Sequence, residues 1–225
     1  MSTAPHCSAP PSFRYQAVLW DLDGTLADSE PVHERSFIDA CQGLDLDLPD
    51  DFHTVMLGKS DDWTHHWLCK HAGLRLSHTD WLMLRHKAYL ARLGEVQPIP
   101  ASVALWHRLA AAGVRQAVVS NSDRRIVMAN LERLGLMRPS LVTVSRNDVR
   151  VGKPDPECYR RAAYLLGVDP AHTAAVEDSA TGLTAARAAG LSTYMMPSFD
   201  PAGSAEDNWA QFAVLDRLMA PSGHP

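Results

Sequence analysis

The sequence has few cysteines, no long apolar run and no excess of positive charge. Its four cysteines, Cys7, Cys41, Cys69 and Cys158, are scattered and include no C-x-x-C pair, which is typical of reduced thiols in a cytoplasmic protein. No apolar run reaches the length of a membrane span. A net charge of −5 does not favour binding to nucleic acid or to a membrane surface. We therefore expect a cytoplasmic protein without such partners.

The 225 residues suffice for one large domain, or for one domain with an insertion. Met1–Ser12 is rich in Pro, Ser and Ala and lacks both the basic start and the apolar stretch of a secretion signal. We expect residues 1–14 to form a disordered tail. We expect the folded remainder to be a monomer.

Strands and helices alternate along most of the chain. Short apolar runs predict five strands, at Gln16–Trp20, Val114–Val119, Leu141–Val144, Thr173–Val176 and Thr193–Met196. Segments that end at a glycine predict the helices between them, at Ala101–Ala112, Arg124–Leu134, Pro156–Leu166 and Ala180–Ala189. This alternation predicts the α/β class, with a doubly wound parallel sheet and right-handed crossovers.

The connection from Asp21 to the second strand is far longer than the dozen or so residues that a parallel crossover needs. Ser29 and Pro31 are typical of a helix N-terminus, and the sequence stays helix-like from there to Gly94. We predict an α/β catalytic core formed by residues 15–27 and 97–225. We predict an inserted helical cap at residues 28–96, which is a natural lid. The segment after Pro197 is loop-like, with one short helix expected at Trp209–Leu218.

Polar side chains follow the ends of several predicted strands. They are Asp21 and Asp23 after the first strand, Ser120 and Asn121 after the second, Lys153 downstream of the third, and Glu177 and Asp178 at the fourth. The carboxyl ends of parallel strands meet at one edge of a sheet, so these groups can converge. Carboxylates beside a hydroxyl, an amide and an ammonium suit a Mg²⁺ ion next to a dianion. Taken singly, the Asp21–Gly24 motif is equally explained as a turn. Each of the other three, taken singly, is better explained as a turn, a loop or a helix cap, and only their occurrence together favours a site.

Four segments resemble, in order, the motifs of the haloacid dehalogenase superfamily. These segments are Asp21-Leu22-Asp23-Gly24-Thr25, Val119-Ser120-Asn121, Gly152-Lys153-Pro154 and Glu177–Gly182. Asp28–His33 and the helical insertion are similar to the β-phosphoglucomutase-like and sugar-phosphatase branch of that superfamily. The resemblance covers about Tyr15–Met196 and implies a Rossmann-like core with a helical cap.

The resemblance also implies a role for each motif residue. Asp21 would be the nucleophile that forms an aspartyl phosphate, and Asp23 would be the general acid and then the base for the hydrolytic water. Ser120 and the main chain of Asn121 would donate to phosphate oxygens, and Lys153 would neutralise developing charge.

The implied cofactor is Mg²⁺. By the same resemblance, Asp21, the main-chain carbonyl of Asp23 and Asp178 would hold the ion, with Glu177 acting through water. In the cap, His33 and Lys59 are candidate substrate-binding residues. The open alternative is a surface or core role for His33 and a solvated side chain for Lys59.

We predict a Mg²⁺-dependent phosphatase for a small phosphorylated metabolite, a sugar or polyol phosphate. The alternative is a phosphohexose mutase of the β-phosphoglucomutase type. Asp61 and Asp62 stand where that family has a cap arginine, and this disfavours the mutase. A dehalogenase is disfavoured because Asp23 is present. An inactive binding module is a third hypothesis, disfavoured because every motif is complete.

Overall fold

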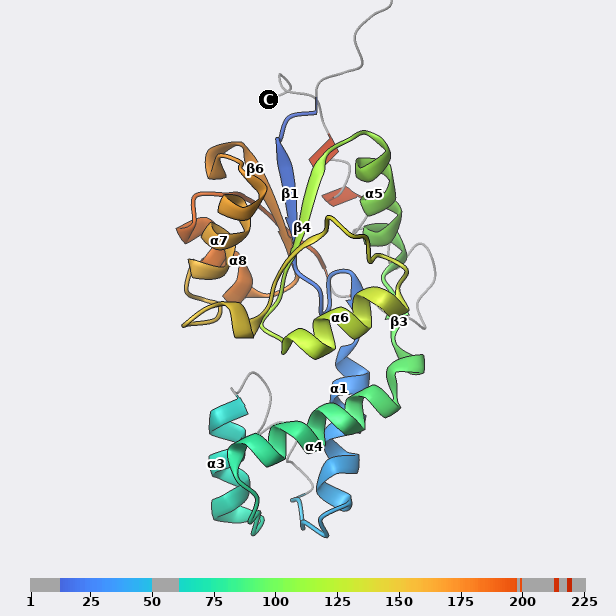
Figure 1. The fold of residues 1–225 in the computed structure, drawn as a ribbon, viewed down its shortest axis with the longest axis vertical. Coiled ribbons are helices and arrows are strands. Elements are labelled where there is room, and N and C mark those ends of the chain that lie inside the picture. The colour runs from blue at the N-terminus through green and yellow to red at the C-terminus, as the bar shows by residue number, and fades with distance from the viewer. Residues whose placement is uncertain (1–12, 50–60, 198, 200–212, 215–217, 220–225) are drawn as a thin grey trace, which may run out of the picture. The chain divides into compact units, whose positions relative to one another are not determined.

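The computed structural model describes residues 13–49, 61–197, 199, 213–214 and 218–219 (Figure 1). The chain divides into two compact units. We call the first the core unit; it comprises Met1–Leu26, Ile99–Asn121 and Ser140–Pro225. We call the second the helical unit; it comprises Ala27–Pro98 and Ser122–Pro139. The chain therefore passes between the units at four points.

The core unit contains a five-stranded sheet in the order β5-β4-β1-β6-β7, and every pair is parallel. Its strands are β1 (Ala17–Trp20), β4 (Arg115–Val119), β5 (Val142–Val144), β6 (Thr173–Glu177) and β7 (Ser192–Met195). Its helices are α5 (Pro100–Ala111), α7 (Glu157–Leu166) and α8 (Ala180–Ala188), with short 3-10 turns η2 (Arg146–Asp148) and η3 (Pro170–His172). This confirms the predicted doubly wound α/β fold.

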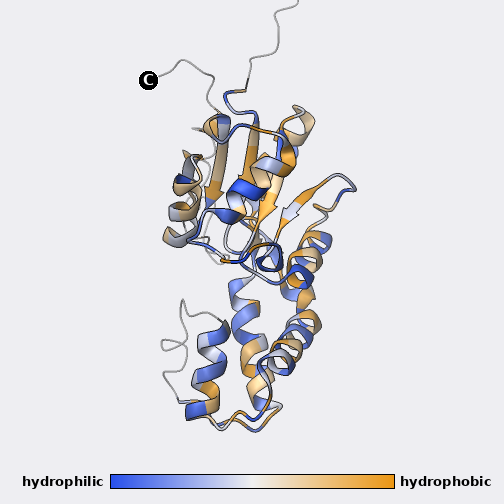
Figure 2. Cartoon of the chain, turned by 60° about the vertical axis from the view of Figure 1, so that its left-hand side comes forward, coloured by the Kyte–Doolittle hydropathy of each residue, from blue (hydrophilic) through white to orange (hydrophobic). Residues whose placement is uncertain are grey.

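Side chains on the central strand β1 alternate between the two faces of the sheet, as the strand period requires. Leu19 packs in a core cluster with residues of α7 and α8, whereas Trp20 packs against Trp106 of α5 at a ring separation of 6.1 Å. The helices cover both faces (Figure 1). Every residue of β1 is buried, which explains its uninterrupted apolar sequence. In Figure 2 the strands are mainly orange, while the helices divide between orange and blue faces.

The helical unit contains α1 (Glu30–Gln42), α3 (Asp61–His71), α4 (His78–Ala91) and the 3-10 turn η1 (Leu93–Glu95). Its core is a cluster of buried residues, Phe37, Ala40, Cys41, Leu68, Leu74 and Trp81. Arg92 lies at the end of α4 and forms ion pairs with Asp39 of α1 and with Glu95. A two-residue antiparallel pair, β2 (Ala27–Asp28) with β3 (Gln97–Pro98), joins the ends of the insertion. The sequence patterns do not indicate this pair, because two residues are too few for a period.

Helix α6 (Arg124–Arg133) also belongs to the helical unit, although it follows β4 and lies within residues 97–225, which the sequence predicts as core. The contacts of α6 explain this. The Tyr89 hydroxyl on α4 donates to Asn130 Oδ1 on α6 at 2.9 Å, and both residues are buried. Arg133 donates to the carbonyl of Gly94 at 3.1 Å. These long-range contacts cannot be read from the amphipathic pattern of α6 alone.

The short helix expected at Trp209–Leu218 lies mostly outside the described residues, where only 213–214 and 218–219 are described, as helical. The expected tail at residues 1–14 also lies outside them, apart from its last two residues. Of the helices that the structure describes, none is long and apolar enough to cross a membrane.

Replacing Tyr89 with Phe should destabilise the helical unit. The change removes a donor from the buried Asn130 amide, and such a loss typically costs about 1–3 kcal/mol in the free energy of unfolding. Urea unfolding followed by fluorescence measures the difference. Tyr164→Phe is the matched control, because Tyr164 is 83% exposed. Equal stability of the two variants would contradict the structural importance of this bond.

Candidate active site

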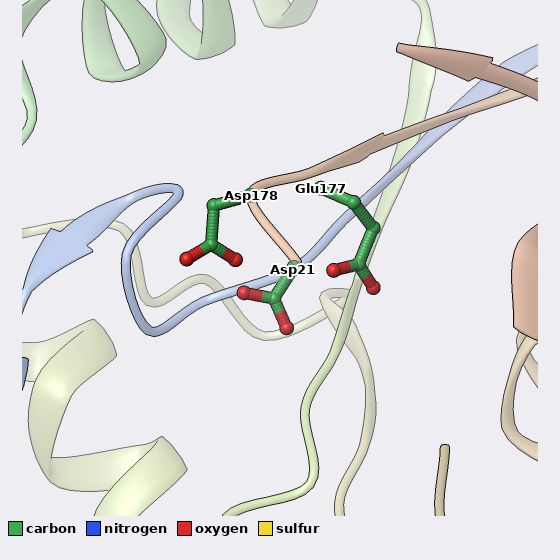
Figure 3. Close-up of side chains that lie close together, drawn as sticks. All are labelled: Asp21, Glu177 and Asp178. Atoms are coloured by element: carbon green, nitrogen blue, oxygen red, sulfur yellow. The ribbon is translucent and has the colours of Figure 1, made fainter. Parts of the chain in front are cut away.

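Asp21 is the first residue after β1, and it lies at the centre of the polar groups at the carboxyl edge of the sheet. Its main-chain N–H donates to the carbonyl of Val176 on β6 at 2.9 Å, so it is held by the neighbouring strand. The residue is 7% exposed. Figure 3 shows its carboxylate beside those of Glu177 and Asp178. Each of the three offers an oxygen, and these oxygens lie within 4.8 Å of one another.

The turn after Asp21 depends on Gly24. Gly24 has φ +79°, in the left-handed region, and a Cβ built there would overlap the carboxylate of Asp178. The buried hydroxyl of Thr25 donates to Asp178 Oδ1 at 3.5 Å. The Asp-Gly-Thr sequence therefore brings the main chain after β1 against the residue that follows β6.

Lys153 is the positive charge of this cluster. Its Nζ donates to Asp21 Oδ1 at 2.5 Å and to the carbonyl of Val119 at 2.9 Å, and it lies 2.6 Å from Glu177 Oε1. Burial lowers the pKa of Lys153, but the negative charges of Asp21 and Glu177 outweigh this effect and raise it above its usual value. The lysine is therefore charged at neutral pH.

The carboxylates outnumber this ammonium. Burial raises the pKa of Asp21 well above its ordinary value, Lys153 opposes the shift, and the charges of Glu177, Asp178 and Asp23 add to it. A second cation would relieve this repulsion. The donors are all hard oxygens, they lie within reach of one ion, and Mg²⁺ prefers such ligands. The residues present therefore fit a divalent cation.

Ser120 and Asn121 follow β4 and make different contacts. The Ser120 hydroxyl donates to Asp23 Oδ2 at 3.1 Å. The Asn121 side chain holds the main chain of Lys153, because its Nδ2 donates to the Lys153 carbonyl at 3.2 Å and its Oδ1 accepts from the Lys153 N–H at 2.8 Å. A Cβ on Gly152 would lie 2.6 Å from Asn121 Oδ1, so this glycine permits the contact.

Glu177 is fully buried at the end of β6, and its partners include residues that the motifs do not contain. The hydroxyl of Tyr159 donates to Glu177 Oε1, and the Ser179 hydroxyl donates to Oε2 at 3.3 Å. Burial, reinforced by the charge of Glu177, raises the pKa of Tyr159 well above its usual value, so the hydroxyl keeps its proton. Sequence reasoning missed Tyr159. The sequence does contain one indication, because Tyr159 lies on the apolar face of a helix that begins a few residues after Lys153.

The structure brings together the predicted residues of the core unit, which are Asp21, Asp23, Ser120, Asn121, Lys153, Glu177 and Asp178. His33 lies on α1 in the helical unit, where its half-buried ring packs against Tyr89 at a centroid distance of 4.4 Å. Lys59 lies outside the described residues.

The fold and this site together define a doubly wound α/β enzyme with an acidic centre at the carboxyl edge of its sheet. A family model described as haloacid dehalogenase-like hydrolase matches residues 15–190. Protein CbbY of Rhodobacter capsulatus is 34% identical over 81% of this chain and 86% of its own length. Fructose-1-phosphate phosphatase YqaB of Escherichia coli is 31% identical over 79% of this chain and 94% of its own.

A crystal structure is also similar. A mutant of CbbY from Rhodobacter sphaeroides, in complex with xylulose-(1,5)bisphosphate, aligns with a TM-score of 0.76 and 27% identity, over 89% of this chain and 99% of that one. The chain belongs to the haloacid dehalogenase-like hydrolase family. Within that family it is a phosphoric monoester hydrolase of the sugar-phosphatase branch.

Replacing Gly182 with Ala should damage this site. Alanine usually stabilises a helix interior relative to glycine by about 1 kcal/mol. Here a Cβ on Gly182 of α8 would overlap the buried carboxylate of Glu177. We expect a loss of about 1–3 kcal/mol in the free energy of unfolding instead, as for other overpacked sites.

Denaturant unfolding measures the effect, and phosphatase turnover should fall with it. Gly94→Ala is the control, because nothing lies within 4 Å of a Cβ at Gly94. Stabilisation by Gly182→Ala would show that Glu177 is not confined by this helix.

Proposed function

We propose that this chain is a Mg²⁺-dependent phosphatase that hydrolyses a small sugar or polyol phosphate through an aspartyl phosphate on Asp21. The observation that carries the proposal is the Asp21 carboxylate, buried at the end of β1 and held by Lys153 beside two further carboxylates. The named activity of the Escherichia coli relative and the sugar bisphosphate in the CbbY complex support the substrate class.

Asp21, Asp178 and the main-chain carbonyl of Asp23 would hold the Mg²⁺, with Glu177 beside them. The mutual closeness of the three carboxylates supports this set. When bound, the ion would offset the negative charge that phosphate and carboxylates bring together. Lys153 supplies the protein's own positive charge at the same place.

The reaction would proceed in two displacements. In the first, a carboxylate oxygen of Asp21 forms a bond to phosphorus while the ester P–O bond breaks, and Asp23 gives a proton to the leaving alcohol. In the second, water attacks the same phosphorus, Asp23 takes a proton from it, and the Asp21 carboxylate leaves. The sum is one ester and one water giving one alcohol and one phosphate.

Ser120 and Asn121 would receive the phosphate oxygens. The Ser120 hydroxyl donates to Asp23, the proposed acid/base. This contact supports a place for Ser120 between Asp23 and the phosphate that is transferred. The Asn121 side chain is engaged with the main chain of Lys153, so its main-chain N–H is the donor proposed for phosphate. His33 on α1 remains a proposed substrate contact, and Lys59, outside the described residues, remains a proposed contact to the leaving group.

The proposed setting is a monomer in a reducing compartment such as the cytoplasm. Among the residues that the structure describes, Cys41, Cys69 and Cys158 are free thiols. Free thiols are typical of proteins in a reducing compartment, which supports this setting. Burial raises the pKa of Cys41 to about 12 and that of Cys158 to about 11, so both thiols stay protonated at neutral pH.

Inorganic phosphate should be released from several sugar and polyol phosphates. The release should stop in excess chelator and return with Mg²⁺, because the carboxylates need a cation to accept a dianion beside them. A panel of phosphorylated metabolites with a phosphate assay measures this. Full activity in excess chelator would contradict the metal assignment.

Phosphorus NMR distinguishes the phosphatase from the mutase. β-Glucose 1-phosphate is incubated with the enzyme and a trace of the bisphosphate. Asp62 is exposed at the start of α3, and its Oδ1 lies 3.4 Å from His78 Nε2. By the resemblance, the mutase branch has a cap arginine at this place in the sequence. Repulsion between the Asp62 carboxylate and a second phosphate group disfavours the binding of a bisphosphate. Rapid conversion to glucose 6-phosphate with negligible free phosphate would overturn the proposal.

Asp23→Asn should leave the fold intact and lose turnover on a sugar phosphate by about 10²–10⁴-fold, the usual contribution of a general acid–base group. The poor alcohol leaving group depends on the proton that Asp23 supplies. The thermal midpoint and Mg²⁺ binding report whether the site is otherwise intact. Asp47→Asn removes an exposed carboxylate and is the charge-matched control. Near wild-type turnover in Asp23→Asn would assign proton transfer to another group.

A further inference from the structure

The Glu177 carboxylate has neighbours at both oxygens. Two donors meet at its Oε1, which are the Tyr159 hydroxyl and the Lys153 ammonium at 2.6 Å. Ser179 donates to its Oε2. On the remaining side, the missing Cβ of Gly182 leaves just enough room for the carboxylate. Glu177 is 0% exposed, so its orientation is set entirely by these neighbours.

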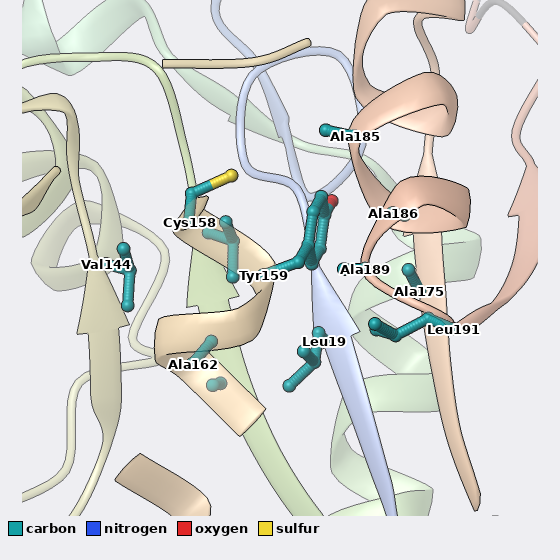
Figure 4. Close-up of a cluster of buried hydrophobic side chains, with 12 residues drawn as sticks. Leu19, Val144, Cys158, Tyr159, Ala162, Ala175, Ala185, Ala186, Ala189 and Leu191 are labelled. Carbon is teal, nitrogen blue, oxygen red and sulfur yellow. The ribbon is translucent and has the colours of Figure 1, made fainter. Parts of the chain in front are cut away.

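Tyr159 reaches Glu177 from the hydrophobic core. It belongs to the buried cluster between the sheet and helices α7 and α8, whose other members are Leu19, Ala117, Val119, Val144, Cys158, Ala162, Ala175, Ala185, Ala186, Ala189 and Leu191. No other member carries a hydroxyl. Figure 4 shows the Tyr159 ring near the centre of the cluster, with its oxygen at the end away from Leu19. A buried tyrosine hydroxyl needs a partner, and here the partner is the active-site carboxylate.

The hydroxyl affects how Lys153 is shared. Asp21 and Glu177 both bind the same ammonium, at 2.5 and 2.6 Å. The hydrogen bond from Tyr159 stabilises part of the negative charge on Glu177, so Glu177 depends less on Lys153 for this. The ammonium therefore stays available to Asp21. The ring contributes separately, because Lys153 Nζ lies 5.3 Å from its centroid.

We propose that Tyr159 is a positioning residue of the acidic centre: its hydroxyl fixes Glu177 toward the Mg²⁺ site and keeps Lys153 on Asp21. The inference rests on the proposed function in assuming that this centre binds Mg²⁺. Tyr159 does not touch the reacting atoms; it acts through Glu177 and Lys153.

Tyr159→Phe separates this role from packing, because it keeps the ring in the core and its contact with Lys153 and removes only the hydroxyl. Removal of a group that orients a metal ligand typically weakens metal binding or activity about 10–100-fold. We expect about tenfold weaker Mg²⁺ binding by calorimetry and about tenfold lower kcat, with an unchanged KM for the sugar phosphate.

Two further variants complete the design. Tyr159→Leu should weaken Mg²⁺ binding at least as much, because it also removes the ring beside Lys153, and should lower the thermal midpoint, because it leaves a cavity in the cluster. Tyr164→Phe removes the same hydroxyl from an 83% exposed position of the same helix and should match the wild type in every measurement.

Calorimetry does not depend on turnover, so the two proposals fail separately. If Tyr159→Phe binds Mg²⁺ as tightly as the wild type, or more tightly, the positioning role is overturned, whatever happens to the thermal midpoint. If Tyr159→Phe binds Mg²⁺ about tenfold more weakly while the wild type releases no phosphate from any ester, the positioning role holds and the phosphatase proposal fails. Absence of Mg²⁺ binding by the wild type would overturn both.

Discussion

The Lys153 ammonium between the carboxylates of Asp21 and Glu177 is the contact on which the rest of the core unit's site depends. Three carboxylates at one sheet edge repel one another, and two of them are buried. Unpaired buried charges are strongly destabilising. Lys153 offsets part of this charge, and the remaining imbalance suits a divalent cation. The excess of negative charge that would destabilise the fold is therefore the same property that suits this site to the proposed metal ion.

Small residues make this concentration of charge sterically possible. Gly24, Gly152 and Gly182 each lie where a Cβ would press on a functional side chain, namely Asp178, Asn121 and Glu177. Alanines fill much of the cluster between the sheet and α7 and α8. Close approach of the helices lets a core residue such as Tyr159 reach the edge of the sheet. Packing and chemistry are therefore not separate here, because the residues that fill the core also hold the site.

The helical unit is built on different contacts. Its core includes Phe37, Leu68 and Trp81. It also includes α6, which follows Asn121 in the chain. The buried bond between Tyr89 and Asn130 joins α6 to α4. Consequently the chain leaves the core unit directly after a proposed phosphate-binding residue.

The sequence by itself determined the order of strands and helices, the long insertion, and the acidic residues at the ends of β1 and β6, because these depend on local patterns and on the direction that parallel strands share. The ends of most elements agree within a residue or two, as at β4 and α7. Only the tertiary structure decided that α6 joins the helical unit, that Asn121 holds the main chain of Lys153, and that Tyr159 bonds to Glu177. These contacts join residues far apart in the chain, and a side chain's partner across a fold leaves no periodic signal in the sequence around it.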